Sequence, residues 1–180
     1  MYVMRKVSKH FDGLKELIST TGGGVGVEIG SFSGESMQVF MESDLVKKLY
    51  CVDPYITAGP KKYLRENNIV DVDKEIKSVE ALFNQRAKKY GDKVVKIKKY
   101  ASDAIKDIPA KVDFVYIDGL HTYEGCKSDI KDYYGIVKPG GWLCGHDYCE
   151  RWPGVIKAVD EFAKDKEVKT FQDTSWAIRL

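Results

Sequence analysis

The sequence predicts an α/β fold built around one parallel sheet. Short apolar segments alternate with amphipathic segments along the 180 residues. The apolar segments are rich in β-branched and aromatic residues, as buried strands are. Strands that alternate with helices pair in parallel through right-handed crossovers, and the helices cover both faces of the sheet.

Five strands are predicted, and most of them end in a carboxylate or close to one. They cover residues 25–29, 49–53, 94–98, 112–118 and 142–147. A sheet of this kind binds ligands outside the carboxyl ends of its strands. Four carboxylates and one histidine lie at those ends: Glu28, Asp53, Asp118, His146 and Asp147. This concentration of polar groups predicts that the functional site lies at that edge.

Helical patterns lie between the strands. They are expected over residues 7–19, 35–42, 73–90, 123–135 and from Pro153 onward. Asp73 is a candidate cap for the third of these helices, and Pro153 suits the first turn of the last. The tail, residues 168–171 and 174–180, is expected to form an antiparallel hairpin. The stretch from Pro54 to Asp73 is the least regular and is expected to be a loop beside the ligand site, or a flap over it.

The composition fits one globular domain over residues 1–180, with a leading helix within 1–21 and a core over 22–180. The chain is 43% hydrophobic and 31% charged, which excludes a disordered class. A formal net charge of +2 gives no basic field, so nucleic acid is not favoured as a partner. Because no apolar run reaches the roughly 18 residues of a membrane span, no membrane partner is expected.

The four cysteines are Cys51, Cys126, Cys144 and Cys149, and they form no CxxC pair. They are expected to be reduced thiols, which predicts a cytoplasmic protein.

A glycine-containing loop, Glu28-Ile-Gly-Ser-Phe-Ser-Gly34, follows the first strand. Gly30 permits a tight turn there, and Gly34 permits close approach of a ligand. The dinucleotide fingerprint GxGxxG does not fit, because Phe32 stands where the second glycine would be. Glu28 disfavours a pyrophosphate and suits a ligand that carries an ammonium and a sulfonium group. Asp53 ends the next strand, where a carboxylate accepts hydrogen bonds from ribose hydroxyls.

These residues resemble the S-adenosylmethionine site of the class I methyltransferases. Two later segments are more specific: Phe114-Val-Tyr-Ile-Asp-Gly-Leu-His-Thr-Tyr123 and Lys138-Pro-Gly-Gly-Trp-Leu-Cys-Gly-His-Asp-Tyr148. In this order they resemble the IDGxHxY and PGG…HDY segments of small methyltransferases that are often encoded near glycan and natural-product biosynthesis genes. The resemblance covers residues 22–180.

The resemblance implies a Rossmann-like sheet of seven mostly parallel strands in the order 3-2-1-4-5-7-6, with strand 7 antiparallel and helices on both faces. It implies that the loop contacts the methionine part of the cofactor, that Asp53 contacts the ribose, and that Ser102 and Asp103 lie on the adenine side. The cofactor-binding residues that it implies are Glu28, Gly30, Ser31, Gly34, Asp53, Ser102, Asp103 and Asp118.

Asp118 and Asp147 end the fourth and fifth strands, which should lie ~5 Å apart. Two carboxylates that close need a shared proton, a basic partner or a cation, and Mg²⁺ or Mn²⁺ would fit. Relatives that methylate sugars with a metal carry an Asp-x-x-His and a later Asp, which Asp118-Gly-Leu-His121 and Asp147 match. The residue before Asp147 is not a second acid but His146. The predicted ligands are therefore Asp118, Asp147 and His146, with the third ligand left open.

The resemblance implies that the metal holds an acceptor oxygen and lowers its hydroxyl pKa. His121, beside Asp118, is then the predicted base that removes the proton. Purely structural roles remain open for the same residues. Asp118 would then bind a backbone amide, His121 would cap the next helix, and Asp147 would pair with Arg151.

The expected function is O-methylation of a hydroxyl on a sugar or another small acceptor. Tyr55, Tyr148 and Trp152 follow strand ends and are candidates for an acceptor pocket, although scattered surface aromatics are equally ordinary. Two alternatives stay open: a nicotinamide-dependent oxidoreductase and a non-catalytic cofactor-binding protein of the same fold. The small net charge and the terminal hairpin are compatible with a homodimer.

Overall fold

The computed structural model describes residues 11–56 and 72–180, which contain one seven-stranded sheet in the order β3-β2-β1-β4-β5-β7-β6. Strands β1 to β5 are parallel, and β7 is antiparallel to both β5 and β6. The strands are β1 (Gly24–Ile29), β2 (Val46–Val52), β3 (Val94–Ile97), β4 (Val112–Ile117), β5 (Val137–Gly145), β6 (Lys169–Thr170) and β7 (Trp176–Arg179). The predicted fold class and strand order are confirmed.

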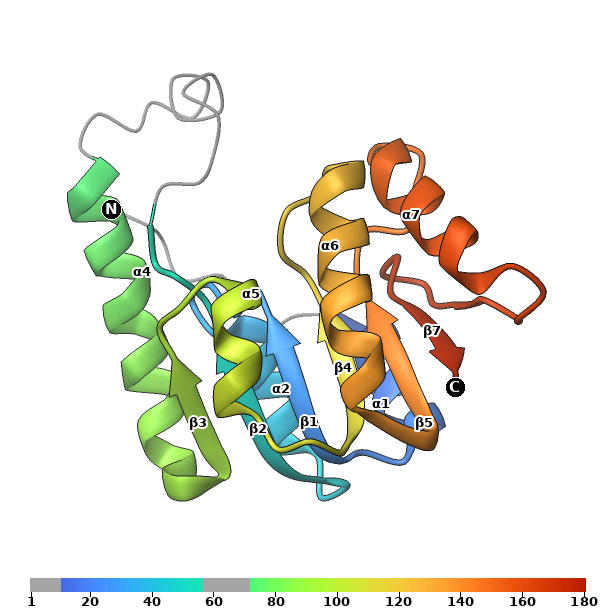
Figure 1. Ribbon diagram of the computed structural model, residues 1–180. Coiled ribbons are helices and arrows are strands. Elements are labelled where there is room, and N and C mark those ends of the chain that lie inside the picture. Colours follow the sequence, from blue (N-terminus) through green and yellow to red (C-terminus); the bar gives the residue numbers. More distant parts are fainter. Residues whose placement is uncertain (1–10, 57–71) are drawn as a thin grey trace.

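Helices cover both faces of this sheet (Figure 1). Helices α1, α2 and α4 pack on one face, where Phe40 and Phe83 are fully buried, and α5, α6 and α7 pack on the other. The α-helices are α1 (Asp12–Thr21), α2 (Glu35–Glu42), α4 (Val72–Ala87), α5 (Ala101–Ala104), α6 (Tyr123–Tyr133) and α7 (Pro153–Ala163). Short 3₁₀ segments follow three of them: η2 (Lys88–Lys93), η3 (Ile105–Asp107) and η4 (Tyr134–Ile136).

Strand β5 begins at Val137, five residues before the predicted start at Trp142. The segment Lys138–Gly141 resembles a turn in sequence, but it forms a bulge: between the pairs Val112–Val137 and Phe114–Trp142, β4 has a single residue. A bulge tolerates proline and glycine because its residues are not all paired within the ladder. The backbone of Leu180 also bonds to both glycines of this segment, which fixes it as part of the sheet.

The remaining predictions differ little from the structure. Helix α1 covers Asp12–Thr21, and the part of the predicted helix before residue 11 lies outside the described part of the chain. Most of the loop predicted from Pro54 to Asp73 also lies outside it. The terminal hairpin is present, but β7 starts at Trp176 because Thr174 occupies the turn with φ of 70°.

Every helix in the described part of the chain falls short of the length and hydrophobicity that a bilayer crossing requires. The four cysteines are free, and three of them are buried. The cytoplasmic location expected from these thiols stays a prediction.

Strand β3 forms one edge of the sheet and carries charged side chains. The ammonium groups of Lys96 and Lys98 lie 2.6 Å and 2.7 Å from the two carboxylate oxygens of Glu80 on α4. These ion pairs tie the edge strand to the helix that packs beside it.

Candidate active site

The glycine loop after β1 draws three strand ends together. The amide of Gly30 donates to the carbonyl of Val52 on β2, and the amide of Asp118 donates to the carbonyl of Ile29 on β1, both at 2.8 Å. Gly30 has φ of 87°, and a Cβ atom there would lie 2.0 Å from the Asp118 carbonyl oxygen. Only glycine fits this position without a shift of the backbone.

Glu28 is fully buried beneath this loop. Its Oε1 accepts a hydrogen bond from the hydroxyl of Ser36 on α2, and its Oε2 has no partner among the described residues. Burial raises the pKa of Glu28 to about 7, although hydrogen bonds from Ser36 and Ser31 oppose the shift. Glu28 therefore lies behind the cavity wall, and direct contact with the methionine part of a cofactor stays a prediction.

Asp53, at the end of β2, holds the glycine loop. One carboxylate oxygen accepts from the amide of Phe32 at 2.9 Å, and the other accepts from the amide of Tyr55 at 2.7 Å. Burial raises the pKa of Asp53, while these two amides partly offset the shift. Each oxygen keeps a second acceptor direction for a ligand hydroxyl.

Gly34 begins α2 with φ of 79°, and a Cβ atom there would lie 2.9 Å from the side chains of both Met37 and Phe83. Close packing against the core, not only approach of a ligand, therefore requires glycine there. Arg86 of α4 is a buried residue that the sequence reasoning missed. Its guanidinium donates to the carbonyl of Ser33 in the loop and lies 3.6 Å from Glu35.

Ser102 and Asp103 lie in the short helix α5 directly after β3, and both are exposed. They stand at the same sheet edge as Asp53, which follows the neighbouring strand. Their role on the adenine side stays a prediction.

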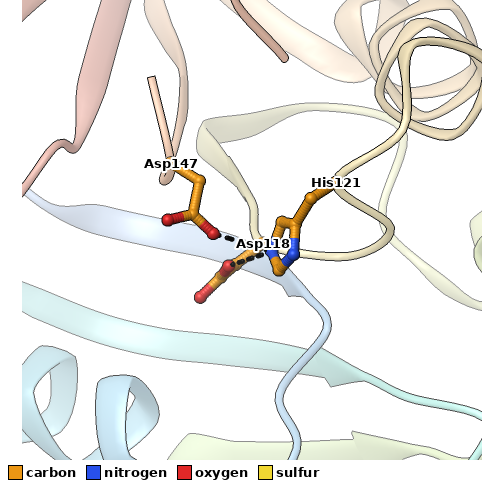
Figure 2. Close-up of side chains that lie close together, drawn as sticks. All are labelled: Asp118, His121 and Asp147. Carbon is orange, nitrogen blue, oxygen red and sulfur yellow. Dashed lines mark hydrogen bonds and ion pairs between the residues drawn. The ribbon is translucent and has the colours of Figure 1, made fainter. Parts of the chain in front are cut away.

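Asp118, His121 and Asp147 come together from two segments of the chain, the loop after β4 and the loop after β5. Figure 2 shows both carboxyl groups turned toward the imidazole. The Nε2 atom of His121 lies 2.9 Å from Oδ2 of Asp147 and 3.3 Å from Oδ1 of Asp118. One ligand atom from each of the three lies within 4.8 Å of the others, a spacing at which they could hold a metal ion.

His146 contacts the same cluster and also lines the cavity beside it. Its Nδ1 lies 3.3 Å from Oδ1 of Asp147. Asp147 has φ of 62°, so the chain bends after β5 and both residues reach the site, whereas a regular strand would have turned them to opposite faces. The structure groups His121, not His146, with the two acids. The role of His146 as a metal ligand stays a prediction.

The charges in this cluster shift each other's pKa values. Burial lowers the pKa of His121, but hydrogen bonds with Asp118 and Asp147 outweigh it and raise the pKa to about 9. In the same way, the bond to Asp147 raises the pKa of His146 to about 9. Burial raises the pKa of Asp147, but the bonds from the two histidines outweigh it and hold it well below its usual range.

Two of the structural alternatives do not occur. Thr122, not His121, caps α6: its hydroxyl oxygen accepts from the amide of Gly125 at 3.1 Å. Asp147 pairs with the two histidines, and no ion pair joins it to Arg151 within the described ranges.

The three aromatic residues predicted to line an acceptor pocket lie in two different parts of the structure. Trp152 packs against His121, with ring centroids 4.7 Å apart. Tyr148 lies nearby on the same loop and donates to Asp160 of α7 at 2.7 Å. Tyr55 is instead buried after β2 against Phe83, with ring centroids 5.9 Å apart. The structure thus gathers only Trp152 and Tyr148 near the acidic cluster.

A cavity of about 190 Å³ lies between the glycine loop and the acidic cluster. Asp118 belongs to both its wall and the cluster. Tyr116, which the sequence reasoning did not single out, also faces it. The lining residues are Phe11, Gly30, Ser31, Phe32, Ser33, Glu35, Ser36, Tyr116, Asp118 and His146.

A family model described as a methyltransferase domain matches residues 27–148. An uncharacterized protein of Acanthamoeba polyphaga mimivirus is 32% identical over 146 residues, which are 77% of this chain and 59% of that protein. The chain therefore spans little more than half of that relative's length.

Two solved structures have a similar fold. The O-methyltransferase NovP is 19% identical, with a TM-score of 0.66 over 96% of this chain and 78% of its own. CalS11, a TDP-rhamnose 3'-O-methyltransferase of calicheamicin biosynthesis, is 16% identical, with a TM-score of 0.62 over 96% of this chain and 81% of its own. At these identities the likeness shows the fold alone.

Proposed function

Because the chain belongs to this methyltransferase family, we propose that it transfers the methyl group of S-adenosylmethionine to a hydroxyl oxygen of a sugar or another small acceptor, with Mg²⁺ or Mn²⁺ at the acidic cluster. The observation that carries the proposal is the position of Asp118, which lines the cavity beside the glycine loop and also belongs to the cluster with His121 and Asp147. The two neighbouring folds are O-methyltransferases, which supports oxygen as the acceptor atom. The family match favours methyl transfer over the oxidoreductase alternative.

The residues around the cavity fit the cofactor. The tight turn at Gly30 brings the loop against the Asp118 backbone and so places both in the cavity wall, and Asp53 can still accept hydrogen bonds from ribose hydroxyls. Glu28 lies behind Ser31 and Ser36 with a pKa raised to about 7, and a cationic ligand in the cavity would favour its charged form. When bound, S-adenosylmethionine supplies a methyl group on a sulfonium that an oxygen nucleophile can take.

We propose Asp118, Asp147 and Nε2 of His121 as the metal ligands. Two carboxylates and one imidazole, with open positions left for water or substrate, suit Mg²⁺ or Mn²⁺. Such an ion would lower the pKa of an acceptor hydroxyl bound to it. A nitrogen that binds the ion cannot also receive a proton, so this role differs from the base that the sequence suggested for His121.

His146 is the neighbouring group suited to receive the hydroxyl proton. It lines the cavity together with Asp118, and its Nδ1 faces Asp147, which leaves Nε2 as the accepting atom. A cation held by Asp147 weakens the carboxylate's hold on the His146 proton and so brings its pKa down toward neutrality. The two histidines thus divide the tasks of holding the ion and moving the proton.

Calorimetric titration with S-adenosylhomocysteine, in Mg²⁺ and again in EDTA, tests the cofactor. We expect binding in both buffers and its loss in Asp53→Ala. Absence of binding to the folded wild-type protein in both buffers would overturn the proposal. Binding without turnover on any hydroxylated acceptor would support the non-catalytic alternative.

Mn²⁺ titration of two histidine variants tests the division of tasks. His121→Ala should lose at least tenfold in Mn²⁺ affinity, because it removes a ligand. His146→Ala should keep Mn²⁺ and S-adenosylhomocysteine affinity but lose at least a hundredfold in turnover, as expected when a general base is removed. The opposite pattern would show that His146 binds the metal ion and that His121 accepts the hydroxyl proton.

A further inference from the structure

The carboxyl group of Glu28 lies directly behind the wall of the cavity. Its Oε1 accepts a hydrogen bond from the hydroxyl of Ser36, and its Oε2 has no partner among the described residues. Ser36 lines the cavity, whereas Glu28 is fully buried and does not. One serine side chain therefore separates this carboxyl group from a ligand in the cavity.

The other charged side chains of the cavity wall each lie near a group of opposite charge. The pairs are Glu35 with Arg86 at 3.6 Å, Asp118 with His121 at 3.3 Å, and His146 with Asp147 at 3.3 Å. Glu28 differs, because no lysine, arginine or histidine in residues 11–56 and 72–180 forms an ion pair with it. A positive charge in the cavity would therefore meet a carboxyl group that has no counter-ion of its own.

The groups beside Glu28 in the sheet do not supply a charge that could compensate it. Glu28 pairs with Cys51 of β2 and with Tyr116 of β4. Burial raises the pKa of the Cys51 thiol and that of the Tyr116 hydroxyl well above their ordinary values, so both stay neutral from pH 6 to pH 8. Burial, together with the charge of Asp118, raises the pKa of Glu28 to about 7 against the hydrogen bonds of its neighbours. Without a ligand, Glu28 is therefore about half protonated at neutral pH.

We infer that Glu28 makes the cavity select the charge on the ligand's sulfur atom, so that the ionised carboxyl group favours the sulfonium of S-adenosylmethionine over the neutral thioether of S-adenosylhomocysteine. This inference rests on the proposed function and adds to it a pH-dependent discrimination between cofactor and product. A nearby cation favours the ionised form of a carboxyl group, and by the same coupling free energy the ionised form favours binding of the cation. A neutral thioether has no such coupling.

Methyl transfer removes the charge that Glu28 favours. The bond from sulfur to the methyl carbon breaks with its electron pair left on sulfur, the methyl carbon bonds to the acceptor oxygen, and the hydroxyl proton passes to the base. The sulfur is then a neutral thioether, and Glu28 returns to its mixture of protonated and ionised forms. The product is held less tightly than the cofactor, which favours exchange of one for the other.

The test measures how pH changes the preference for the cofactor. S-adenosylmethionine and S-adenosylhomocysteine are titrated by calorimetry into the wild type and Glu28→Gln at pH 6, 7 and 8, in EDTA and without acceptor. The preference is the dissociation constant of S-adenosylhomocysteine divided by that of S-adenosylmethionine. Groups of the ligands titrate equally with both proteins, so the preference of the wild type relative to Glu28→Gln isolates Glu28. This relative preference should rise about fivefold to tenfold from pH 6 to pH 8, the range over which Glu28 ionises.

At pH 8, Glu28→Gln should lose about tenfold in affinity for S-adenosylmethionine relative to S-adenosylhomocysteine, which corresponds to one unit of pKa coupling. A merely structural defect would weaken both ligands by the same factor. Glu42→Gln is the matched control, since Glu42 is an exposed acid of α2 that pairs with Lys89, and it should keep the wild-type preference at every pH.

A second measurement needs no variant. In buffers of different ionisation enthalpy at pH 7, the wild type should release about half a proton more on binding S-adenosylmethionine than on binding S-adenosylhomocysteine. Equal proton release with the two ligands would overturn the inference, and so would a preference with the same pH dependence in the wild type and in Glu28→Gln. The proposed function would stand in both cases. If neither ligand binds the folded wild type, the proposed function fails, and the inference fails with it.

Discussion

Gly30 and Asp118 are in direct backbone contact: a Cβ atom on Gly30 would lie 2.0 Å from the Asp118 carbonyl oxygen. The loop proposed to hold the cofactor and the first acid of the proposed metal cluster are therefore positioned by the same contact. A change at Gly30 should disturb both functions together.

Gly30→Ala should lower the free energy of unfolding by about 2–4 kcal/mol, because it adds a backbone clash to strain at positive φ. Affinity for S-adenosylhomocysteine and for Mn²⁺ should fall in the same variant. Urea denaturation and calorimetry measure the three quantities. Gly135→Ala is the control, since nothing lies within 4 Å of its Cβ position. Equal stabilities of the two variants would contradict the role of this contact.

Glu28 should make the protein less stable as pH rises. Its pKa of about 7 in the folded protein exceeds its ordinary value of 4.5. The stability linked to its proton is therefore full below about pH 4.5 and is lost as pH rises through 7, by about 2–3 kcal/mol. In Glu28→Gln this loss should disappear. The free energy of unfolding of the wild type and of Glu28→Gln is measured at pH 5 and at pH 8. The difference between the two proteins removes the effect of the other titrating groups.

Glu42→Gln serves as the control for Glu28, because Glu42 is exposed and pairs with Lys89 on the surface. It should keep the wild-type pH dependence. A Glu28→Gln variant that loses as much stability between pH 5 and pH 8 as the wild type would show that Glu28 ionises freely.

Metal binding to the acidic cluster should release a proton. In the metal-free protein the His121 pKa is raised to about 9, so its ring is protonated at pH 7.5. A metal ion that takes Nε2 must displace that proton. Mn²⁺ titrations in buffers of different ionisation enthalpy should show more than one proton released at pH 7.5, because the ion displaces the His121 proton and also lowers the raised pKa of His146. In His121→Asn the release should fall by about one proton, and in His146→Asn it should fall by less than that. Proton release equal in both variants would assign the proton elsewhere.

Arg86 should support the glycine loop. Arg86→Ala leaves the carbonyl of Ser33 without its buried donor, which should cost about 2–4 kcal/mol of stability and weaken S-adenosylhomocysteine binding roughly tenfold. Arg86→Lys keeps the charge but not the planar fork, so it should recover only part of the loss. Lys89→Ala, an exposed cation at the start of the following 3₁₀ segment, should leave both measurements unchanged.

Much of the fold follows from local patterns. The apolar run before Glu28 and the acids at Asp53 and Asp118 mark strand ends, because buried strands and polar loops differ sharply in composition. The predicted start of β5 at Trp142 was wrong, because Pro139 and the glycines beside it have the composition of a turn. Their place in the sheet comes from hydrogen bonds to Leu180, a residue far along the chain.

The site was predictable where one motif holds several of its residues. Asp118 and His121 are three residues apart, and the loop between them is short enough to bring both to one edge. The contact of Trp152 with His121 and the bond from Arg86 to Ser33 join distant segments. No spacing in the sequence encodes them. The bend at Asp147 could not be predicted from the sequence either, because the residue with the positive φ is not a glycine.

Lys96 of β3 and Lys98, just past the end of this strand, limit how copies of the protein can associate. A strand that joined the sheet at β3 would have to run beside Lys96 and Lys98, whose charges are already satisfied by Glu80. Charged edge strands of this kind resist edge-to-edge pairing of sheets into larger aggregates. Strand pairing between two copies at β3 is therefore disfavoured, and a second copy would have to bind at another surface of the protein.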